Sequence, residues 1–277
     1  MIGRSKWSCA TAIMLIVLSP VLLRSEPLGH DLSDSIDQAR GATVGILRAP
    51  DEQEEEISSG HFSIRGSGFH LRDGYIVTAR HAVERREGSK SVIPEEIAVL
   101  TENFEEVPAS LIGVNAFLDL TLYRVNPQDS TLSLSKVSFS EEKVAQGHEV
   151  FTVGYPLGRG PALGFGRLGN LHTFLPTAQT RLMQIDLSVC SGNSGGGVFN
   201  AKGEVVGMVQ AIVQTESNQG ERRCSRFAFA VPGHLVQRIV GAIIDGSHPG
   251  FPRIGIGMTA AKVGNRWRVA VSKATGP

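Results

Sequence analysis

Residues 190–197 read Cys-Ser-Gly-Asn-Ser-Gly-Gly-Gly, which sets a serine among glycines between two apolar runs. A serine hydroxyl attacks a carbonyl poorly unless a base accepts its proton and nearby donors receive the charge that develops on oxygen. Because glycine adopts backbone torsions closed to other residues, the segment Gly192-Asn193-Ser194 is able to turn the N–H groups of Gly192 and Ser194 towards one point. The octet therefore predicts Ser194 as a nucleophile beside an oxyanion hole, with an ordinary turn as the simpler alternative.

A candidate base lies upstream, in the sequence YIVTARHAV at residues 75–83. The β-branched run ends and small residues begin near His81, as expected where a strand gives way to a short turn. Histidine has an unperturbed pKa of about 6.5, which suits proton exchange near neutral pH. The other histidines stand in no paired arrangement, so surface or core roles are the simpler interpretation for them: His30, His61, His70, His148, His172, His234 and His248.

A candidate acid opens the alternating stretch LDLTLYRV at residues 118–125, which predicts a strand that begins next to Asp119. A carboxylate there can orient an imidazole and stabilise the imidazolium, and a strand-capping surface aspartate is the alternative. The three candidates follow the chain order His81, Asp119, Ser194, spaced 38 and 75 residues apart. This order is informative because unrelated folds arrange the same three roles in different sequences.

Taken together, these motifs resemble those of a trypsin-like serine protease of the HtrA (Deg) family. The similarity runs from about residue 35 to about residue 258, with Gly197 where proline is usual and Thr121 where alanine is common. Neither departure removes a catalytic atom. The segments that carry the resemblance are 66–69, 78–83, 119–122, 153–158, 184–186, 192–196, 203–207 and 227–232.

The pattern of short β-rich runs between Gly and Pro predicts an all-β chain, and the resemblance implies two six-stranded Greek-key β-barrels with a C-terminal helix and the active cleft between the barrels. We expect a first barrel over 35–140, a second barrel with its helix over 141–245, and a tail over 246–277 that resembles the start of a PDZ domain. The helix is expected at 233–245 from its apolar spacing. Strands are expected near 42–48, 61–79, 95–125, 149–154, 181–187, 204–213 and 225–231.

The resemblance implies a serine endopeptidase that works through an acyl-enzyme on protein or peptide substrates, unfolded proteins included, in extracytoplasmic quality control. It also implies a primary pocket lined by Ser188, Val189 and Ile212, with no acid at its base, so we expect cleavage after small or medium aliphatic residues. A catalytically silent relative that binds peptides and a glutamate-specific relative are the alternatives. No cofactor or metal is expected, and a homo-oligomer stays open.

The chain begins with a basic flank, Arg4 and Lys6, followed by the apolar residues 7–23 with Pro20 among them. This form predicts an export signal over residues 1–24. The absence of a clear small-x-small cleavage site before residues 24–26 makes an uncleaved membrane anchor the rival interpretation. Both predict an exported protein, periplasmic or secreted, with or without anchoring to the membrane.

Cys9 lies in the export segment, which leaves Cys190 and Cys224 as an even pair in the remaining chain. Export favours a disulfide between them, and the trypsin branch has a similar bridge. In the chain-entropy model a loop of 34 residues contributes roughly 3 to 4 kcal/mol. Two unpaired thiols are the alternative, and zinc is disfavoured because no further thiolates or paired histidines accompany them.

Composition excludes several other classes. Lys plus Arg and Asp plus Glu both number 27, so nothing steers the chain towards nucleic acid or an anionic membrane surface. The sequence GFGRLG at residues 164–169 matches a dinucleotide fingerprint, but residues 170–174 are typical of strand or loop rather than of the helix which that motif requires. We therefore assign this sequence no nucleotide.

Overall fold

The computed structural model describes residues 32–48, 63–126, 134–175, 178, 180–212, 224–247 and 256–274. The predicted export segment lies outside these residues. Among the described helices, none combines the length and the apolar character needed to cross a bilayer. The described elements all belong to the part of the chain that follows residue 30.

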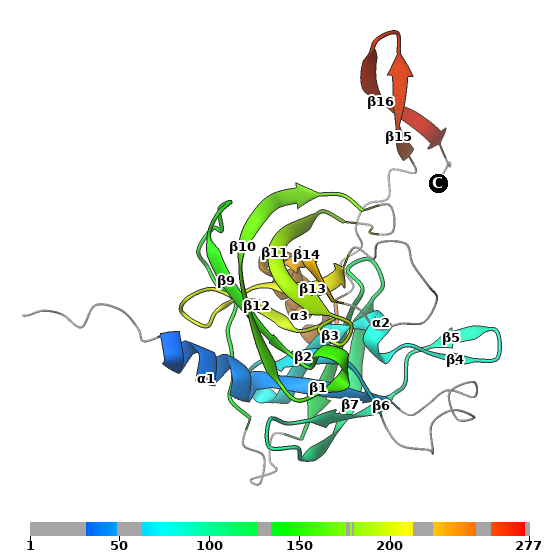
Figure 1. The fold of residues 1–277 in the computed structure, drawn as a ribbon. Helices are drawn as coiled ribbons and strands as arrows, with labels where there is room; N and C mark the ends of the chain where they lie inside the picture. The colour runs from blue at the N-terminus through cyan, green and yellow to red at the C-terminus, as the bar shows by residue number, and fades with distance from the viewer. Residues whose placement is uncertain are drawn as a thin grey trace, which may run out of the picture. The chain divides into compact units, whose positions relative to one another are not determined.

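The first barrel closes through six strands in the order β1-β2-β3-β8-β7-β6 (Figure 1). Every neighbouring pair in it is antiparallel. Its interior is filled by branched apolar residues and one tyrosine, including Val44, Ile76, Val99 and Tyr123. The strands are β1 Thr43–Arg48, β2 Ser63–His70, β3 Tyr75–Ala79, β6 Glu96–Leu100, β7 Glu106–Asn115 and β8 Leu120–Val125.

The second barrel also closes through six antiparallel strands, in the order β10-β11-β14-β13-β12-β9 (Figure 1). Leu168, Ile185, Val198 and Ala230 are among the residues of its core. The strands are β9 Glu149–Gly154, β10 Ala162–Thr173, β11 Leu182–Cys190, β12 Gly197–Phe199, β13 Val205–Ile212 and β14 Cys224–Pro232. The predicted all-β fold of two six-stranded barrels is thus confirmed.

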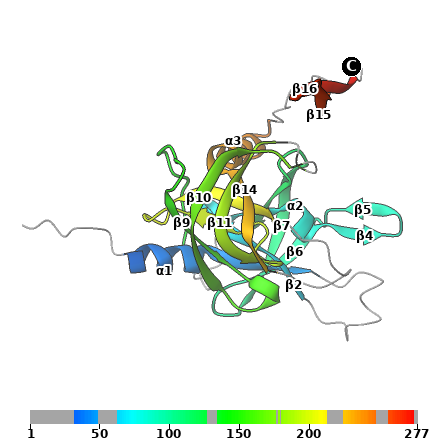
Figure 2. The ribbon, with the colours of Figure 1, turned by 45° about the horizontal axis from the view of Figure 1, so that its top comes forward.

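The helix α3, Gly233–Ile244, follows β14 and packs against strands of both barrels (Figure 2). Its buried stripe, Val236, Ile239 and Val240, follows the helical spacing expected from the sequence. It packs on β7 and β8 of the first barrel and on β13 and β14 of the second. These three residues belong to an apolar cluster that also contains residues of both barrels. The barrels therefore share a core, and α3 covers it.

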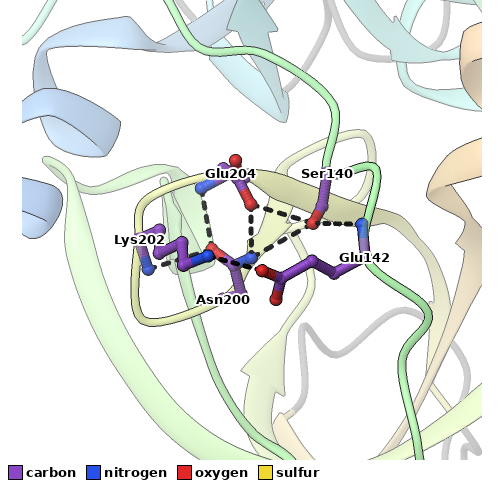
Figure 3. Close-up of polar contacts among 5 residues, drawn as sticks. All are labelled: Ser140, Glu142, Asn200, Lys202 and Glu204. Atoms are coloured by element: carbon purple, nitrogen blue, oxygen red, sulfur yellow. Dashed lines mark hydrogen bonds and ion pairs between the residues drawn. The ribbon is translucent and has the colours of Figure 1, made fainter.

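The segment between the barrels is fastened to the β12–β13 turn. Phe139 pairs with Val205 in a parallel bridge, and the Ser140 N–H donates to the Val205 carbonyl at 3.0 Å. Side chains add a network in which Asn200 and Ser140 donate to one oxygen of Glu204, at 2.8 Å and 2.9 Å (Figure 3). These hydrogen bonds, first that from Asn200, hold the pKa of Glu204 below its usual value.

Several elements were not expected from the sequence. They are α1 Leu32–Ala42, the short helices η1 Arg72–Gly74, α2 Arg80–Val83 and η2 Pro156–Gly158, the hairpin strands β4 Arg85–Glu87 and β5 Lys90–Val92, and the strands β10 and β12. In β10 only Leu168 is buried, so apolar periodicity gives almost no signal there. Residues 164–169 lie inside this strand, which confirms that GFGRLG is not a phosphate-binding turn leading into a helix.

Each of the two longest strands expected from the sequence consists of several shorter strands in the structure. The stretch 61–79 contains β2 and β3, separated by a turn in which Asp73 and Gly74 have φ of 62° and 81°. The stretch 95–125 contains β6, β7 and β8. Near the C-terminus, β15 Ile256–Val263 and β16 Arg266–Ala274 form a two-stranded antiparallel sheet of their own. The resemblance of this hairpin to the start of a PDZ domain stays a prediction.

Candidate active site

His81 and Asp119 form a hydrogen-bonded pair on the first barrel. β3 pairs with β8 so that Ala79 lies opposite Leu120, which brings the residues just beyond them together. The imidazole Nδ1 lies 2.5 Å from one carboxylate oxygen of Asp119, and the backbone N–H of His81 donates to the other at 3.1 Å. The carboxylate therefore holds both the ring and its backbone, and it leaves Nε2 as the nitrogen that can accept a proton.

The backbone torsion and hydrogen bonding at Asp119 support the position of this pair. Asp119 has a φ of 53°, in the left-handed region that aspartate tolerates better than most residues. Its carbonyl accepts the N–H of Arg80 at 2.8 Å. The imidazole is about half exposed, with 45% of the side-chain surface accessible, against 19% for the carboxylate. The pair thus presents a solvent-accessible base backed by a largely covered acid.

Ser194 lies in the loop of residues 191–196 between β11 and β12, which we call the nucleophile loop after the predicted role of Ser194. Gly192 and Gly195 have φ of 102° and 86°, torsions that L side chains rarely adopt. A methyl group on Gly195 would also lie 2.5 Å from the Ala79 nitrogen, at the end of β3. Glycine is therefore required at this position both by backbone torsion and by close approach to the first barrel.

The short helix after β3 and the loop of Ser194 both lie close to Gly66 of β2. A methyl group on Gly66 would lie 2.5 Å from Cβ of Ala82, which follows His81, and 3.0 Å from the Ser194 carbonyl oxygen. The short helix that carries His81 and the loop that carries Ser194 therefore flank one residue of β2. Among the hydrogen bonds of the described residues there is none between the Ser194 hydroxyl and His81. That contact stays a prediction, and such contacts often tighten only when substrate binds.

The backbone of the nucleophile loop leaves two donors unused. The Ser191 carbonyl accepts the Leu157 N–H at 2.6 Å, and the Asn193 carbonyl accepts the Gly196 N–H at 3.0 Å. Because C=O and N–H point in opposite directions in a trans peptide, these bonds fix where the N–H groups of Gly192 and Ser194 point. Within the described residues neither of these two N–H groups has an acceptor, as an oxyanion hole requires.

The predicted disulfide is present between Cys190 and Cys224. The two cysteines face each other across the antiparallel pair β11 and β14. Cys190 directly precedes the nucleophile loop, so the bond anchors the start of that loop to the neighbouring strand.

The three predicted pocket residues are placed unequally. On β11, Ser188 is exposed whereas Val189 is 1% exposed and belongs to the core of the second barrel. Neighbouring residues of a strand point to opposite faces, so these two side chains do not face the same side. The Ile212 side chain lies outside what the structure describes. The pocket therefore stays a prediction, in which β11 contributes the face that carries Ser188.

Sequence reasoning missed the supporting roles of Tyr155 and Leu157, whose backbone contacts the nucleophile loop from the turn after β9. The Tyr155 side chain is buried against Gly45 of the first barrel, and its hydroxyl donates to the Leu100 carbonyl at 3.1 Å. Burial raises the pKa of Tyr155 to about 12, so the phenol stays protonated and keeps donating. Leu157 adopts a left-handed φ of 58°, a conformation that no local propensity of leucine would indicate.

In the described ranges, no group of three or more His, Cys, Asp and Glu side chains is arranged to hold a metal ion. What the arrangement can do is acid–base and nucleophilic chemistry. A histidine–carboxylate pair on one six-stranded barrel and a glycine-bound serine on the next define the class of trypsin-like peptidases.

Comparison with known proteins agrees. Residues 66–208, more than half of the chain, match the trypsin-like peptidase domain. The chain belongs to this family of trypsin-like peptidases and, within it, to the HtrA type of serine protease. The family resemblance drawn from the sequence is thereby confirmed.

Two relatives and one solved structure illustrate the similarity. The chain is 34% identical over 188 residues to the "Probable periplasmic serine endoprotease DegP-like" of Rhizobium meliloti, covering 66% of this chain and 34% of that protein. It is 26% identical over 262 residues to the serine endoprotease DegS of Escherichia coli, covering 88% and 69%. The structure of the HtrA-type protease AlgW with a decapeptide superposes with a TM-score of 0.67 at 17% identity, covering 88% and 79%. The chain thus spans about a third of its DegP-like relative.

Proposed function

We propose that this chain is a serine-type endopeptidase in which His81, Asp119 and Ser194 form the catalytic triad. One observation carries the proposal. Ala82, which follows the hydrogen-bonded His81, and the Ser194 carbonyl both lie close to Gly66, and the loop of Ser194 leaves the N–H groups of Gly192 and Ser194 unpaired among the described residues. Base, nucleophile and oxyanion donors are therefore available within one small region.

The reaction is acyl transfer followed by hydrolysis. The Ser194 hydroxyl oxygen bonds to the substrate carbonyl carbon while its proton passes to Nε2 of His81, and Asp119 stabilises the resulting imidazolium. The N–H groups of Gly192 and Ser194 receive the charge on the carbonyl oxygen. The C–N bond then breaks as His81 returns the proton to the leaving amine. Water attacks the acyl-enzyme by the same path, with His81 again as base, and releases the carboxylic acid.

The substrates in this proposal are proteins or peptides, cleaved after small or medium aliphatic residues. Of the expected pocket residues Ser188, Val189 and Ile212, the pocket would use the exposed face of β11 that carries Ser188, because Val189 lies in the core. The relative from Rhizobium meliloti is named as periplasmic, and the basic and apolar N-terminus fits export. We therefore place the protein outside the cytoplasm, in protein quality control. Retention by a membrane anchor and assembly into a homo-oligomer belong to the same proposal.

The test is labelling with a fluorophosphonate probe, together with turnover of a peptide library. We expect wild-type protein to be labelled and Ser194→Ala to lose labelling, with turnover reduced by about 10⁴ to 10⁶ and the melting temperature nearly unchanged. Peptide binding without labelling would instead favour a silent peptide-binding protein. Cleavage mainly after glutamate, or after lysine and arginine, would contradict the aliphatic pocket.

A further inference from the structure

Ser67 lies where β2, β3, the Tyr155 turn and the nucleophile loop meet, and all of its polar groups are used. The residue is 0% exposed. Its N–H donates to the Ser194 carbonyl at 2.8 Å, and its carbonyl accepts the Thr78 hydroxyl at 2.7 Å. Its hydroxyl accepts the Tyr155 N–H at 2.9 Å and donates to the Gly192 carbonyl at 2.6 Å. Two of these four bonds reach the nucleophile loop.

The bond to Gly192 acts on a particular peptide unit. The Gly192 carbonyl and the Asn193 N–H belong to the peptide between the two that carry the unused donors. Ser67 holds the carbonyl end, and the Cys190 carbonyl accepts the Asn193 N–H at 3.0 Å. Because a peptide unit is planar and stiff, holding both ends fixes its rotation. That rotation in turn sets the directions of the flanking N–H groups of Gly192 and Ser194.

Close packing keeps the Ser67 side chain in place. A methyl group on Gly154 would lie 3.0 Å from the Ser67 hydroxyl oxygen and 2.8 Å from the Asn193 amide nitrogen. A methyl group on Gly196 would lie 3.2 Å from Cβ of Ser67. The serine side chain therefore fits against backbone on two sides, and its hydroxyl contacts the loop at short range without exposure to water.

We propose that Ser67 is a positioning residue for the oxyanion hole. Its hydroxyl bond to the Gly192 carbonyl keeps the central peptide of the nucleophile loop in the orientation that leaves the Gly192 and Ser194 N–H groups free. Ser67 does not touch substrate and transfers no proton. The inference rests on the proposed function of Ser194 and deepens it, because it assigns to the first barrel a control over the donors of the second.

The test compares an oxygen substrate with a sulfur substrate. A peptide ester and its matched thionoester differ only in the carbonyl atom, and sulfur gains less from oxyanion donors because it is a weak acceptor. For Ser67→Ala we expect kcat on the ester to fall about 10- to 100-fold with KM changed less than about threefold, since the donors are misplaced and not removed. The ester-to-thionoester ratio of kcat/KM should fall at least about tenfold. Misfolded protein lowers both rates equally, so it cancels in this ratio.

One variant serves as the matched control. Thr152→Val removes another buried hydroxyl, which donates to the Gly197 carbonyl at 2.7 Å outside the nucleophile loop. We expect it to lower stability to a similar degree while the ratio stays at the wild-type value. If Ser67→Ala gives no soluble protein, Ser67→Cys keeps the shape with a weak donor and should lower the ratio in the same direction.

The outcomes separate the two proposals. A wild-type ratio in Ser67→Ala or Ser67→Cys overturns the role of Ser67 and leaves the triad untouched. A fall in the ratio of equal size in Thr152→Val overturns it as well, because the effect would then be general. Wild-type protein without Ser194-dependent turnover overturns the proposed function, and this inference with it.

Discussion

The two halves of the candidate active site are held by different kinds of contact. On the first barrel the contacts are made by a side chain, because the Asp119 carboxylate hydrogen-bonds both the imidazole and the backbone N–H of His81. On the second barrel, the nucleophile loop is held through its own backbone by Leu157, Val209, Ser67 and Cys190. In the proposed mechanism, a side-chain pair fixes the base, whereas a backbone loop fixes the two oxyanion donors and the nucleophile together. The loop therefore depends on more of the molecule.

Changing Asp119 should give the largest effect of the variants that compare the two halves, and this effect should fall mainly on activity. Asp119→Asn keeps the shape but places an amide beside Nδ1, which disfavours the tautomer that leaves Nε2 free. We expect kcat to fall roughly 10³- to 10⁴-fold, by analogy with this type of triad. The melting temperature should change by only a few degrees, since the site is partly exposed. Steady-state kinetics and thermal unfolding measure the two quantities.

Asp73→Asn is the matched control, because Asp73 is an exposed aspartate with a similar positive φ in the turn before β3. Its activity should equal that of the wild type. Wild-type kcat in Asp119→Asn would show that the pair on the first barrel does not serve catalysis.

Removing the disulfide tests how the nucleophile loop of the second barrel is held, and it should give the second largest effect. The double variant Cys190→Ser with Cys224→Ser removes the bond that ties the start of the nucleophile loop to β14. We expect a loss of roughly 3 kcal/mol in unfolding free energy, from the greater entropy of the unfolded chain. Turnover should also fall, because backbone positions depend on the anchored strand end. Urea unfolding with parallel kinetics measures both.

Adding a reductant to the wild type provides an independent control, since it should reproduce the double variant. An unchanged urea midpoint in both experiments would contradict a stabilising role. If the unfolding free energy falls by the expected amount but kcat per folded molecule is unchanged, the nucleophile loop holds its shape without the disulfide.

Glu204 should give the smallest effect, because it fastens the segment between the barrels and lies in neither half of the site. Its folded pKa is lowered by hydrogen bonds from Asn200 and Ser140, so its contribution is present above its usual value of 4.5 and is lost as the pH falls through the folded pKa. The group is largely solvated, so screening limits the contribution to about 1 kcal/mol or less. Glu204→Gln should therefore lower stability slightly at pH 7, and the difference from wild type should shrink under acid.

Urea unfolding of the wild type and Glu204→Gln at several pH values measures this difference. Glu141→Gln changes a neighbouring exposed carboxylate outside the network and should not show the trend. A difference that grows as the pH falls would contradict the sign derived from the lowered pKa. Turnover should be unaffected, because the segment between the barrels takes part in neither half of the candidate active site.

Local signals in the sequence predicted much of this molecule. The strands of the first barrel and the helix α3 follow from apolar periodicity, and His81, Asp119 and Ser194 follow from their motifs. The strand β10 could not be predicted in this way, because it is rich in glycine and buries only Leu168. The helix α1 was missed as well, and its buried face is made mainly of small residues, Ser35, Ala39, Gly41 and Ala42.

The sequence by itself determined the chemistry: an all-β chain with a histidine, an aspartate and a glycine-bound serine in an order typical of one family. Only the tertiary structure decided how the serine loop is held. Ser67 reaches Gly192 across 125 residues of chain, and Tyr155 reaches Leu100 across 55. Neither contact has a local signature, because hydrogen bonds between distant segments depend on which strands the closed barrels bring together. The side chains proposed to react thus lie in short motifs, whereas their backbone supports exist only once both barrels have formed.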